Sequence, residues 1–151
     1  MHVQDLMTRN PEACVVTDSC VVVGEIMQRR NCGFVPVVDG HMTNRVVGVI
    51  TDRDLALSLA RANRSAERVR VDACMTKPVH TVTPDTRLED AASLMERYAI
   101  HRLPVAQDGQ LVGVLSLVDI ARATDERLGF PDWREAEQKV TEIVEAIAAT
   151  R

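Results

Sequence analysis

Aromatic side chains make up only 3% of this 151-residue sequence, and its formal net charge is -4. Proteins that bind nucleic acids usually present a basic face or rings on which bases stack, so both features disfavour that class. No segment approaches the roughly 20 consecutive apolar residues of a membrane-spanning helix. The opening MHVQDLMTRN also lacks the apolar core of a signal peptide. We therefore expect a cytoplasmic protein with no nucleic-acid or membrane partner.

The four cysteines form no C-x-x-C pair, and no histidine lies beside them at the spacing of metal ligands. They are Cys14, Cys20, Cys32 and Cys74. Three have apolar neighbours, where a free thiol behaves as a small hydrophobic side chain. We expect packing roles in a reducing compartment, with a redox or metal role as the alternative.

Nothing in the sequence indicates catalysis. The four histidines are scattered, and covalent catalysis needs a nucleophile beside a base. We therefore predict a protein that is not an enzyme, with no catalytic residue, no metal site and no required cofactor. Its composition, 46% apolar and 26% charged, is that of an ordinary globular domain.

An internal repeat organises the chain. Residues 3–8, VQDLMT, match residues 71–76, VDACMT, and Pro36-Val37 matches Pro104-Val105 at the same shift. The segment 48–54, GVITDRD, returns as 113–119, GVLSLVD, at a shift smaller by three because the first copy has a longer loop at 39–45. The sequence therefore predicts two copies of one structural unit.

The second copy predicts the order strand, helix, strand, strand, helix. A short strand is expected at Thr81-Val82, followed by a helix that starts at Thr86 with Glu89 as its capping box. The apolar face of this helix is Leu88, Ala91, Ala92 and Met95. Residues 103–106 and 111–115 then form a hairpin around an Asp-Gly turn, and Ser116 begins the last helix.

The first copy predicts the same order. The expected elements are a strand at 15–16, a helix whose apolar face is Val23, Ile26 and Met27, a hairpin of 34–38 with 45–50, and a helix from Thr51. Residues 61–70 contain four arginines and are interpreted as a solvated linker. A basic patch that binds a partner is the alternative.

The composition changes after residues 129–131, Gly-Phe-Pro. Asp132 with Glu135 is predicted to cap a final amphipathic helix. Its apolar stripe is Val140, Ile143, Val144, Ile147 and Ala148. Monomers rarely leave a large apolar patch open, so this stripe packs on its own module or on a second subunit. We expect a homodimer.

Both copies end with a hydroxyl residue and, three positions later, an acid: Thr51 with Asp54, and Ser116 with Asp119. The pattern [ST]-x-x-[DE] is typical of a helix capping box. It also suits a ligand site, because a carboxylate accepts hydrogen bonds from the paired hydroxyls of a ribose. A phosphate is favoured by the free N–H groups at a helix N-terminus.

With two x-x-M-T openings, two apolar-Pro-Val strands and two G-h-h-[TS]-x-x-D endings, where h is apolar, the sequence resembles a tandem pair of cystathionine β-synthase (CBS) domains, a Bateman module. The resemblance extends over about residues 3–125. The sequence is also similar to short stand-alone bacterial proteins that consist of little besides such a pair. It implies an α/β (α+β) fold of two β-α-β-β-α motifs packed about a pseudo-twofold axis, plus a C-terminal helix. The implied domains are 3–62 and 71–125, with a linker at 63–70 and the final helix at 132–150.

The resemblance also implies a regulatory module that senses an adenosine-containing ligand, such as AMP, ADP, ATP or S-adenosylmethionine, in the cleft between the two motifs. Asp54 and Asp119 would bind the ribose, and Thr51 and Ser116 would lie near the phosphates. The remaining implied contacts are backbone groups of Cys14-Val15 and Thr81-Val82 around the base, with Val35-Pro36 and Leu103-Pro104 on the apolar side. The alternative is a structural or dimerisation module without ligand.

Charged neighbours distinguish the two predicted sites. His101 and Arg102 precede the Leu-Pro-Val strand of the second copy, where the first copy has Gly33 and Phe34. The two G-h-h-[TS]-x-x-D endings, residues 48–54 and 113–119, are the closing motifs, and Arg53 is the cation of the first one. We therefore expect the site that contains Asp119 to be the better one for a phosphorylated ligand. The protein target that such a sensor regulates stays unknown.

Overall fold

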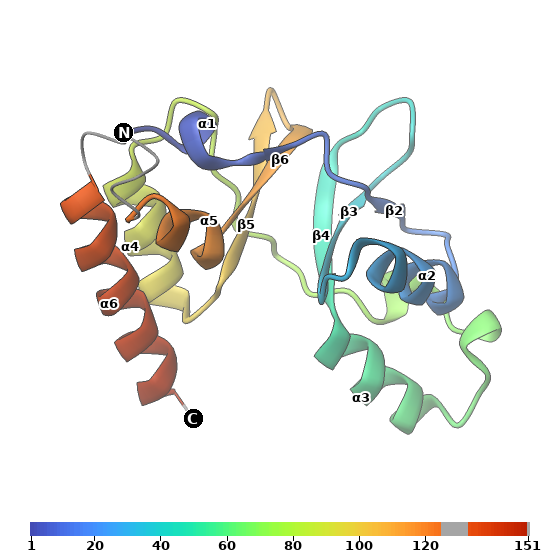
Figure 1. Cartoon of the computed structure of the whole chain (residues 1–151). Coiled ribbons are helices and arrows are strands. Elements are labelled where there is room, and N and C mark those ends of the chain that lie inside the picture. The colour runs from blue at the N-terminus through green and yellow to red at the C-terminus, as the bar shows by residue number, and fades with distance from the viewer. Residues whose placement is uncertain (125–132, 151) are drawn as a thin grey trace. The chain divides into compact units, whose positions relative to one another are not determined.

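The protein is a mixed α/β molecule with two three-stranded sheets (Figure 1). The structure is a computed structural model and describes residues 1–124 and 133–150. The chain divides into two compact units that do not follow the sequence copies. Unit 1 combines Met1–Asn10, His80–Gln107 and the chain from Val112 onwards, whereas unit 2 combines Pro11–Val79 with Asp108–Leu111.

Unit 1 contains a sheet of strand order β1-β6-β5. The strands are β1 (Thr8–Arg9), β5 (Arg102–Gln107) and β6 (Gln110–Ser116), and β1 pairs antiparallel to β6. The predicted strand at Thr81-Val82 is a single parallel bridge from Val82 to Val105. The helices are α1 (Val3–Leu6), α4 (Leu88–Tyr98), α5 (Leu117–Arg122) and α6 (Trp133–Ala149).

The apolar face predicted for α4 is confirmed, since its four residues are at most 2% exposed. The predicted start of this helix is wrong. α4 begins at Leu88 after Arg87, and Arg87 makes no capping hydrogen bond through its side chain. The Thr86 hydroxyl accepts from the Thr83 N–H at 3.0 Å. This hydroxyl stabilises the preceding turn and is therefore not available to form a capping box with Glu89.

The hairpin of β5 and β6 turns at Asp108 and Gly109, as predicted. Their φ angles are 52° and 82°, and two positive φ angles are typical of the type I′ turn that joins hairpin strands. The tip belongs to unit 2, because the Val46 N–H donates to the Gly109 carbonyl at 3.1 Å.

Unit 2 contains a sheet of strand order β2-β3-β4. The strands are β2 (Cys14–Val15), β3 (Phe34–Val38) and β4 (Val46–Thr51), with β2 parallel and β4 antiparallel to β3. The helices are α2 (Cys20–Arg30) and α3 (Asp52–Ala62), followed by short 3-10 helices η1 (Ala66–Arg68) and η2 (Val71–Ala73). Val23, Ile26 and Met27 are buried as predicted.

The interpretation of residues 61–70 as a solvated linker is wrong in part. α3 continues to Ala62, and η1 occupies three further residues. Val69 is 7% exposed and belongs to the core of unit 2. Its carbonyl also accepts from the Cys20 N–H at 2.8 Å. The four arginines are exposed, but the backbone between them is built into the unit.

The final helix α6 packs against α4 and α5 within unit 1 (Figure 1). Ile143 is fully buried, and Val140 and Ile147 pack against the same core. Val144 remains 49% exposed, and Ala148 is also exposed. Much of the predicted stripe is therefore buried on its own unit. The predicted Asp132–Glu135 cap lies outside the described residues and side chains.

Each unit contains the x-M-T segment of the other sequence copy. This segment is residues 6–8 in the first copy and residues 74–76 in the second. Thr8 and Arg9 of the first copy pair with β6 of the second, at Val114 and Gly113. In the same way, the Thr76 N–H of the second copy donates to the Val49 carbonyl in β4 at 2.8 Å. This exchange is why the compact units and the sequence copies have different boundaries.

Candidate functional site

In unit 1 the second closing motif forms the capping box that its sequence predicts. β6 ends at Ser116, and α5 begins at the next residue. The Asp119 N–H donates to the Ser116 Oγ at 3.1 Å, while Asp119 Oδ2 accepts from the Ser116 N–H at 2.8 Å and from its hydroxyl at 2.6 Å. The carboxylate therefore has a defined position at the start of α5.

In unit 2 the first closing motif repeats this geometry. The Asp54 N–H donates to Thr51 Oγ1 at 3.1 Å, and Asp54 Oδ2 accepts from the Thr51 N–H at 2.9 Å. A further donor is the Thr76 hydroxyl, 3.3 Å from the same oxygen. The sequence reasoning missed Thr76, although its place in the x-M-T segment marks it as part of the repeat.

Both acids keep one carboxylate oxygen free of their caps. In the described residues every hydrogen bond to the carboxylates of Asp54 and Asp119 is made through Oδ2. Both residues are half-buried, so Oδ1 can accept from the hydroxyl of a ligand. Capping and ligand binding are therefore compatible roles for the same residue.

Two basic residues, His101 and Arg102, lie at the start of β5, close along the backbone to the Asp119 motif. The His101 carbonyl accepts from the Leu117 N–H at 2.8 Å, which places His101 beside the start of α5. His101 is exposed, and Arg102, the first residue of β5, is half-buried. Neither side chain forms a hydrogen bond or an ion pair with a described residue, so both are available to an anion.

The equivalent position in unit 2 carries an acid that the sequence reasoning missed. The Gly33 carbonyl accepts from the Asp52 N–H at 3.1 Å, just as His101 accepts from Leu117. A Cβ on Gly33 would lie 2.6 Å from Asp52 Oδ2, so this carboxylate covers Gly33. Arg53 is exposed, and its N–H donates to Asp52 Oδ1 at 2.9 Å. When the two repeats are aligned, Asp52 falls opposite Leu117. This difference in the sequence indicates the extra negative charge of unit 2.

The two strands predicted to surround a base have most of their backbone groups engaged. The Val82 N–H donates to the Pro104 carbonyl at 3.2 Å, and the Val82 carbonyl accepts from Ala106 at 2.8 Å. The Val15 N–H donates to Asp18 Oδ2 at 2.9 Å. Thr81 is exposed.

The residues predicted to make apolar contacts with a ligand are all buried. Val35, Leu103 and Cys14 are fully buried, and burial raises the pKa of the Cys14 thiol to about 12. Pro36 and Pro104 are buried as well. Val35 and Leu103 belong to the two hydrophobic cores. Pro36 and Pro104 are the next residues along β3 and β5, so their side chains face the opposite side of each strand.

An aromatic pair lies next to Thr81. The ring of His80 stacks on that of Tyr98 at the end of α4, with centroids 3.7 Å apart and an interplanar angle of 17°. Tyr98 is 44% exposed. The sequence reasoning missed this pair, because only the fold brings residue 98 back to residue 80.

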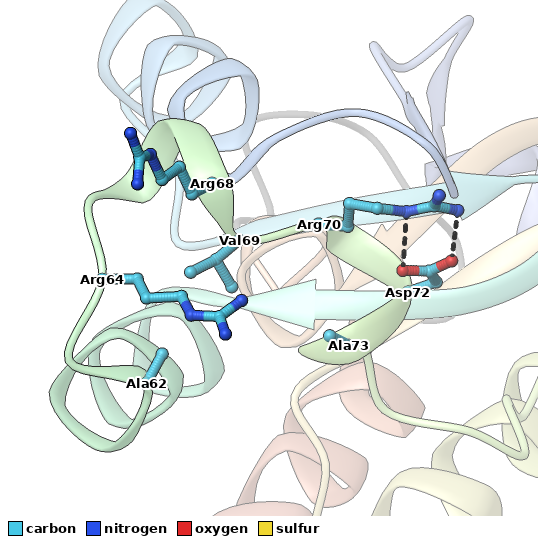
Figure 2. Close-up of a pocket in the computed structure, with 7 residues that line it drawn as sticks. All are labelled: Ala62, Arg64, Arg68, Val69, Arg70, Asp72 and Ala73. Atoms are coloured by element: carbon cyan, nitrogen blue, oxygen red, sulfur yellow. Dashed lines mark hydrogen bonds and ion pairs between the residues drawn. The ribbon is translucent and has the colours of Figure 1, made fainter.

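A pocket of about 470 Å³ lies elsewhere in unit 2, beside the arginine-rich segment (Figure 2). Figure 2 shows that the side chains of Arg68 and Arg70 point in different directions. Arg70 is also paired with Asp72 through contacts of 2.6 and 3.2 Å. None of the predicted site residues lines this pocket. Its lining is Ala62, Arg64, Arg68, Val69, Arg70, Asp72 and Ala73.

Comparison with known proteins identifies a family and several relatives. The family model of the CBS domain matches residues 3–61 and 69–126. The chain is 33% identical over 129 residues to the uncharacterized protein YlbB of Bacillus subtilis, covering 84% of this chain and 86% of YlbB. It is 31% identical over 119 residues to the CBS domain-containing protein YhcV of the same organism, covering 79% of this chain and 82% of YhcV.

Two similar solved structures hold adenosine compounds. The CBS domain pair of protein MJ0100, in complex with 5′-methylthioadenosine and S-adenosyl-L-methionine, is 28% identical with a TM-score of 0.69, and the match covers 84% of this chain and 98% of that one. CBSX2 in complex with AMP is 29% identical with a TM-score of 0.70, and the match covers 83% and 96%.

Proposed function

Because the chain belongs to the CBS-domain family, we propose that it is a regulatory module that binds an adenosine-containing ligand through its two closing motifs. The observation that carries this proposal is the repeated geometry of Asp54 and Asp119. Each acid is fixed by a capping box and keeps one carboxylate oxygen for a ribose. The complexes of the related MJ0100 and CBSX2 support the choice of ligand class.

At the unit 1 motif, Asp119 accepts from the ribose, and His101 and Arg102 provide positive charge for a phosphate. Thr81 contacts the base through its backbone, and Ser116 adds a hydroxyl near the phosphate. The guanidinium group of Arg102 can donate two parallel hydrogen bonds to two oxygens of one phosphate. AMP, ADP or ATP is therefore the ligand class we assign to this motif.

At the unit 2 motif, Asp54 has the same role, but Asp52 adds a negative charge at the start of α3. An anion is disfavoured there by simple repulsion. A sulfonium cation is favoured for the same reason, so S-adenosylmethionine is the ligand we assign to this motif. Arg53 offsets part of the charge.

Thermal unfolding of the purified protein with AMP, ATP, S-adenosylmethionine and GMP tests the proposal. A ligand present at 100 times its Kd adds about 2.7 kcal/mol to the free energy of unfolding. At this chain length that corresponds to a rise in Tm of roughly 2 to 4 °C for each kcal/mol. If none of the three adenosine compounds shifts Tm at millimolar concentration, the proposal is wrong.

Substitution of the two acids separates binding from capping. Asp119→Ala is expected to cost about 1 kcal/mol through the lost cap and to abolish the shift given by AMP. Asp54→Ala is the matched control, since it loses an equivalent cap in unit 2 and keeps the AMP shift. If Asp119→Ala unfolds earlier but binds AMP as tightly as the wild type, the acid is only a cap. A structural module without ligand is then the better interpretation.

The second part of the proposal is that the protein is a homodimer. It acts on a protein target whose identity is unknown, and it catalyses no reaction. Val118 on α5 and Val144 on α6 are 55% and 49% exposed, although both helices pack in the same unit. Light scattering after size exclusion measures the mass directly. The wild type is expected to be dimeric, and Val144→Lys is expected to shift the protein toward a monomer.

A further inference from the structure

Two cysteine sulfurs of unit 2 lie 3.4 Å apart, although 54 positions separate them in the sequence. Cys20 is the first residue of α2, and Cys74 directly follows η2. Both are free thiols, 1% and 9% exposed. No sequence pattern pairs these two cysteines, because they form no motif and lie in different copies of the repeat.

Backbone contacts hold the two sulfurs together. The Cys20 N–H donates to the Val69 carbonyl at 2.8 Å, and the backbones of Ser19 and Arg70 form an isolated antiparallel β-bridge. The Cys74 N–H donates to the Val71 carbonyl at 2.9 Å, and its thiol donates to the Arg70 carbonyl at 3.4 Å. The chain at Val69 and Arg70 is therefore fastened to the start of α2, and Cys74 is held in place by contacts within its own segment.

We propose that Cys20 and Cys74 form a reversible disulfide when the protein meets a peroxide, so that this pair is a redox modification site. The sulfurs have to approach from 3.4 Å to a bond length of about 2.05 Å. We expect rotation of the two side chains to provide this approach, because the segments that carry them are already hydrogen-bonded to each other.

The other two cysteines lack a partner for this reaction. Cys14 is fully buried, and its thiol points to the Pro36 carbonyl at 3.7 Å. Cys32 is half-buried, and its thiol points to the Phe34 carbonyl at 3.5 Å. All four cysteines lie in the described part of the chain, and only Cys20 and Cys74 have sulfurs within contact distance of one another.

The reaction balances with hydrogen peroxide as the oxidant. The sulfur of Cys74, the more exposed of the two, attacks one peroxide oxygen and becomes a sulfenic acid, while the other oxygen leaves as water. The sulfur of Cys20 then attacks the sulfenic sulfur. The S–O bond breaks, and the departing hydroxide takes the Cys20 proton and leaves as a second water. Two thiols and one peroxide thus give one disulfide and two waters, and a dithiol reductant reverses the change.

The bond would fix the segment that leads to Thr76, whose hydroxyl contacts Asp54 at 3.3 Å. Oxidation would therefore act on the unit 2 motif, a consequence that rests on the function proposed above. The disulfide itself does not depend on that function. Its test uses no ligand, so a failure of one proposal is distinguishable from a failure of the other.

Intact-mass measurement of the full chain tests the proposal. The reduced protein is treated with a slight excess of hydrogen peroxide, and its remaining thiols are then blocked by alkylation. We expect the loss of two hydrogens, peptides of Cys20 and Cys74 joined to each other, and alkylated Cys14 and Cys32. Dithiothreitol should restore the reduced mass, and Tm should be several degrees higher in the oxidised form.

Two variants serve as matched controls. Cys32→Ser should form the disulfide as the wild type does, whereas Cys74→Ala should take up no intramolecular cross-link. Four outcomes overturn the proposal: added oxygen without a cross-link, a link that involves Cys14 or Cys32, a covalent dimer, or an unchanged mass. Because mapping of the wild-type protein decides between them, the proposal does not depend on the folding of any variant.

Discussion

The sulfur of Met75 lies 2.9 Å from the position that a Cβ on Gly48 would occupy. The Thr76 carbonyl oxygen lies 3.1 Å from the same position. The first residue of the closing motif is therefore a glycine because the x-M-T segment crosses directly over it. Unit 1 shows the same relationship between Met7 and Gly113, at 2.6 Å.

Gly48→Ala is expected to destabilise the protein. A methyl group at this position overlaps the Met75 sulfur and a backbone oxygen, and overpacking of this kind costs about 1 to 3 kcal/mol. Thermal unfolding should show a lower Tm. Gly24→Ala is the control, because a Cβ there would meet no atom within 4 Å beyond its own stretch of helix. Alanine is also favoured over glycine in a helix by about 0.5 to 1 kcal/mol. Equal Tm values for the two variants would contradict the proposed crossing.

Ser116→Ala is expected to lower the free energy of unfolding by about 1 kcal/mol, because the hydroxyl that accepts from the Asp119 N–H is lost. Ser93→Ala is a suitable control. The Ser93 hydroxyl is exposed and donates to the Glu89 carbonyl of its own helix, a contact that adds little to helix stability. Urea unfolding should separate the two variants, and a loss as large in Ser93→Ala would argue against the cap.

Asp52→Asn is expected to strengthen the binding of AMP to the unit 2 motif and to weaken that of S-adenosylmethionine. The substitution removes the negative charge over Gly33 and keeps the size of the side chain. It should also cost about 0.3 to 1 kcal/mol of stability, since an acid in the first turn of a helix is favourable. Calorimetric titration measures both affinities. If they change in the same direction, charge does not distinguish the ligands.

Alkaline pH is expected to destabilise the protein through Cys14. Burial raises the pKa of this thiol from 9.0 to about 12, so the folded protein keeps a proton that the unfolded chain releases. The contribution is complete below pH 9 and is lost as the pH rises toward 12, by up to about 1.4 kcal/mol for each pH unit.

Urea unfolding at pH 8, 9.5 and 10.5 would measure this loss. Burial also raises the pKa of Cys20, so this thiol adds to the same trend. Cys14→Ala should reduce the fall in stability between the lowest and the highest pH. A variant that loses stability with pH as steeply as the wild type would show that Cys14 is not its source.

The elements of the fold were largely predictable because they depend on local patterns. The apolar spacing of α4, the Asp-Gly turn and the hydroxyl-acid caps at Ser116 and Thr51 each act within a few residues, and the structure contains all of them. The predicted cap at Thr86 was wrong for a reason that is also local. A turn formed with Thr83 competes for the same hydroxyl.

The surroundings of the candidate sites were less predictable, since they depend on contacts between distant segments. Thr76 reaches Asp54 only because the x-M-T segment joins β4, and Asp52 covers Gly33 only because α3 starts beside it. Val69 looked like part of a solvated linker because four arginines surround it, yet its side chain lies in the core.

The exchange of the x-M-T segments bears on how such a chain arises and how it can be divided. One copy of the repeat, expressed alone, would have a sheet edge beside Gly48 or Gly113 with no segment of its own to cover it. It could complete that edge only by taking the opening residues of a second molecule, as in a domain-swapped dimer. Duplication within one chain turns that exchange between molecules into an internal one, and a cut between the copies would restore the dependence on a partner.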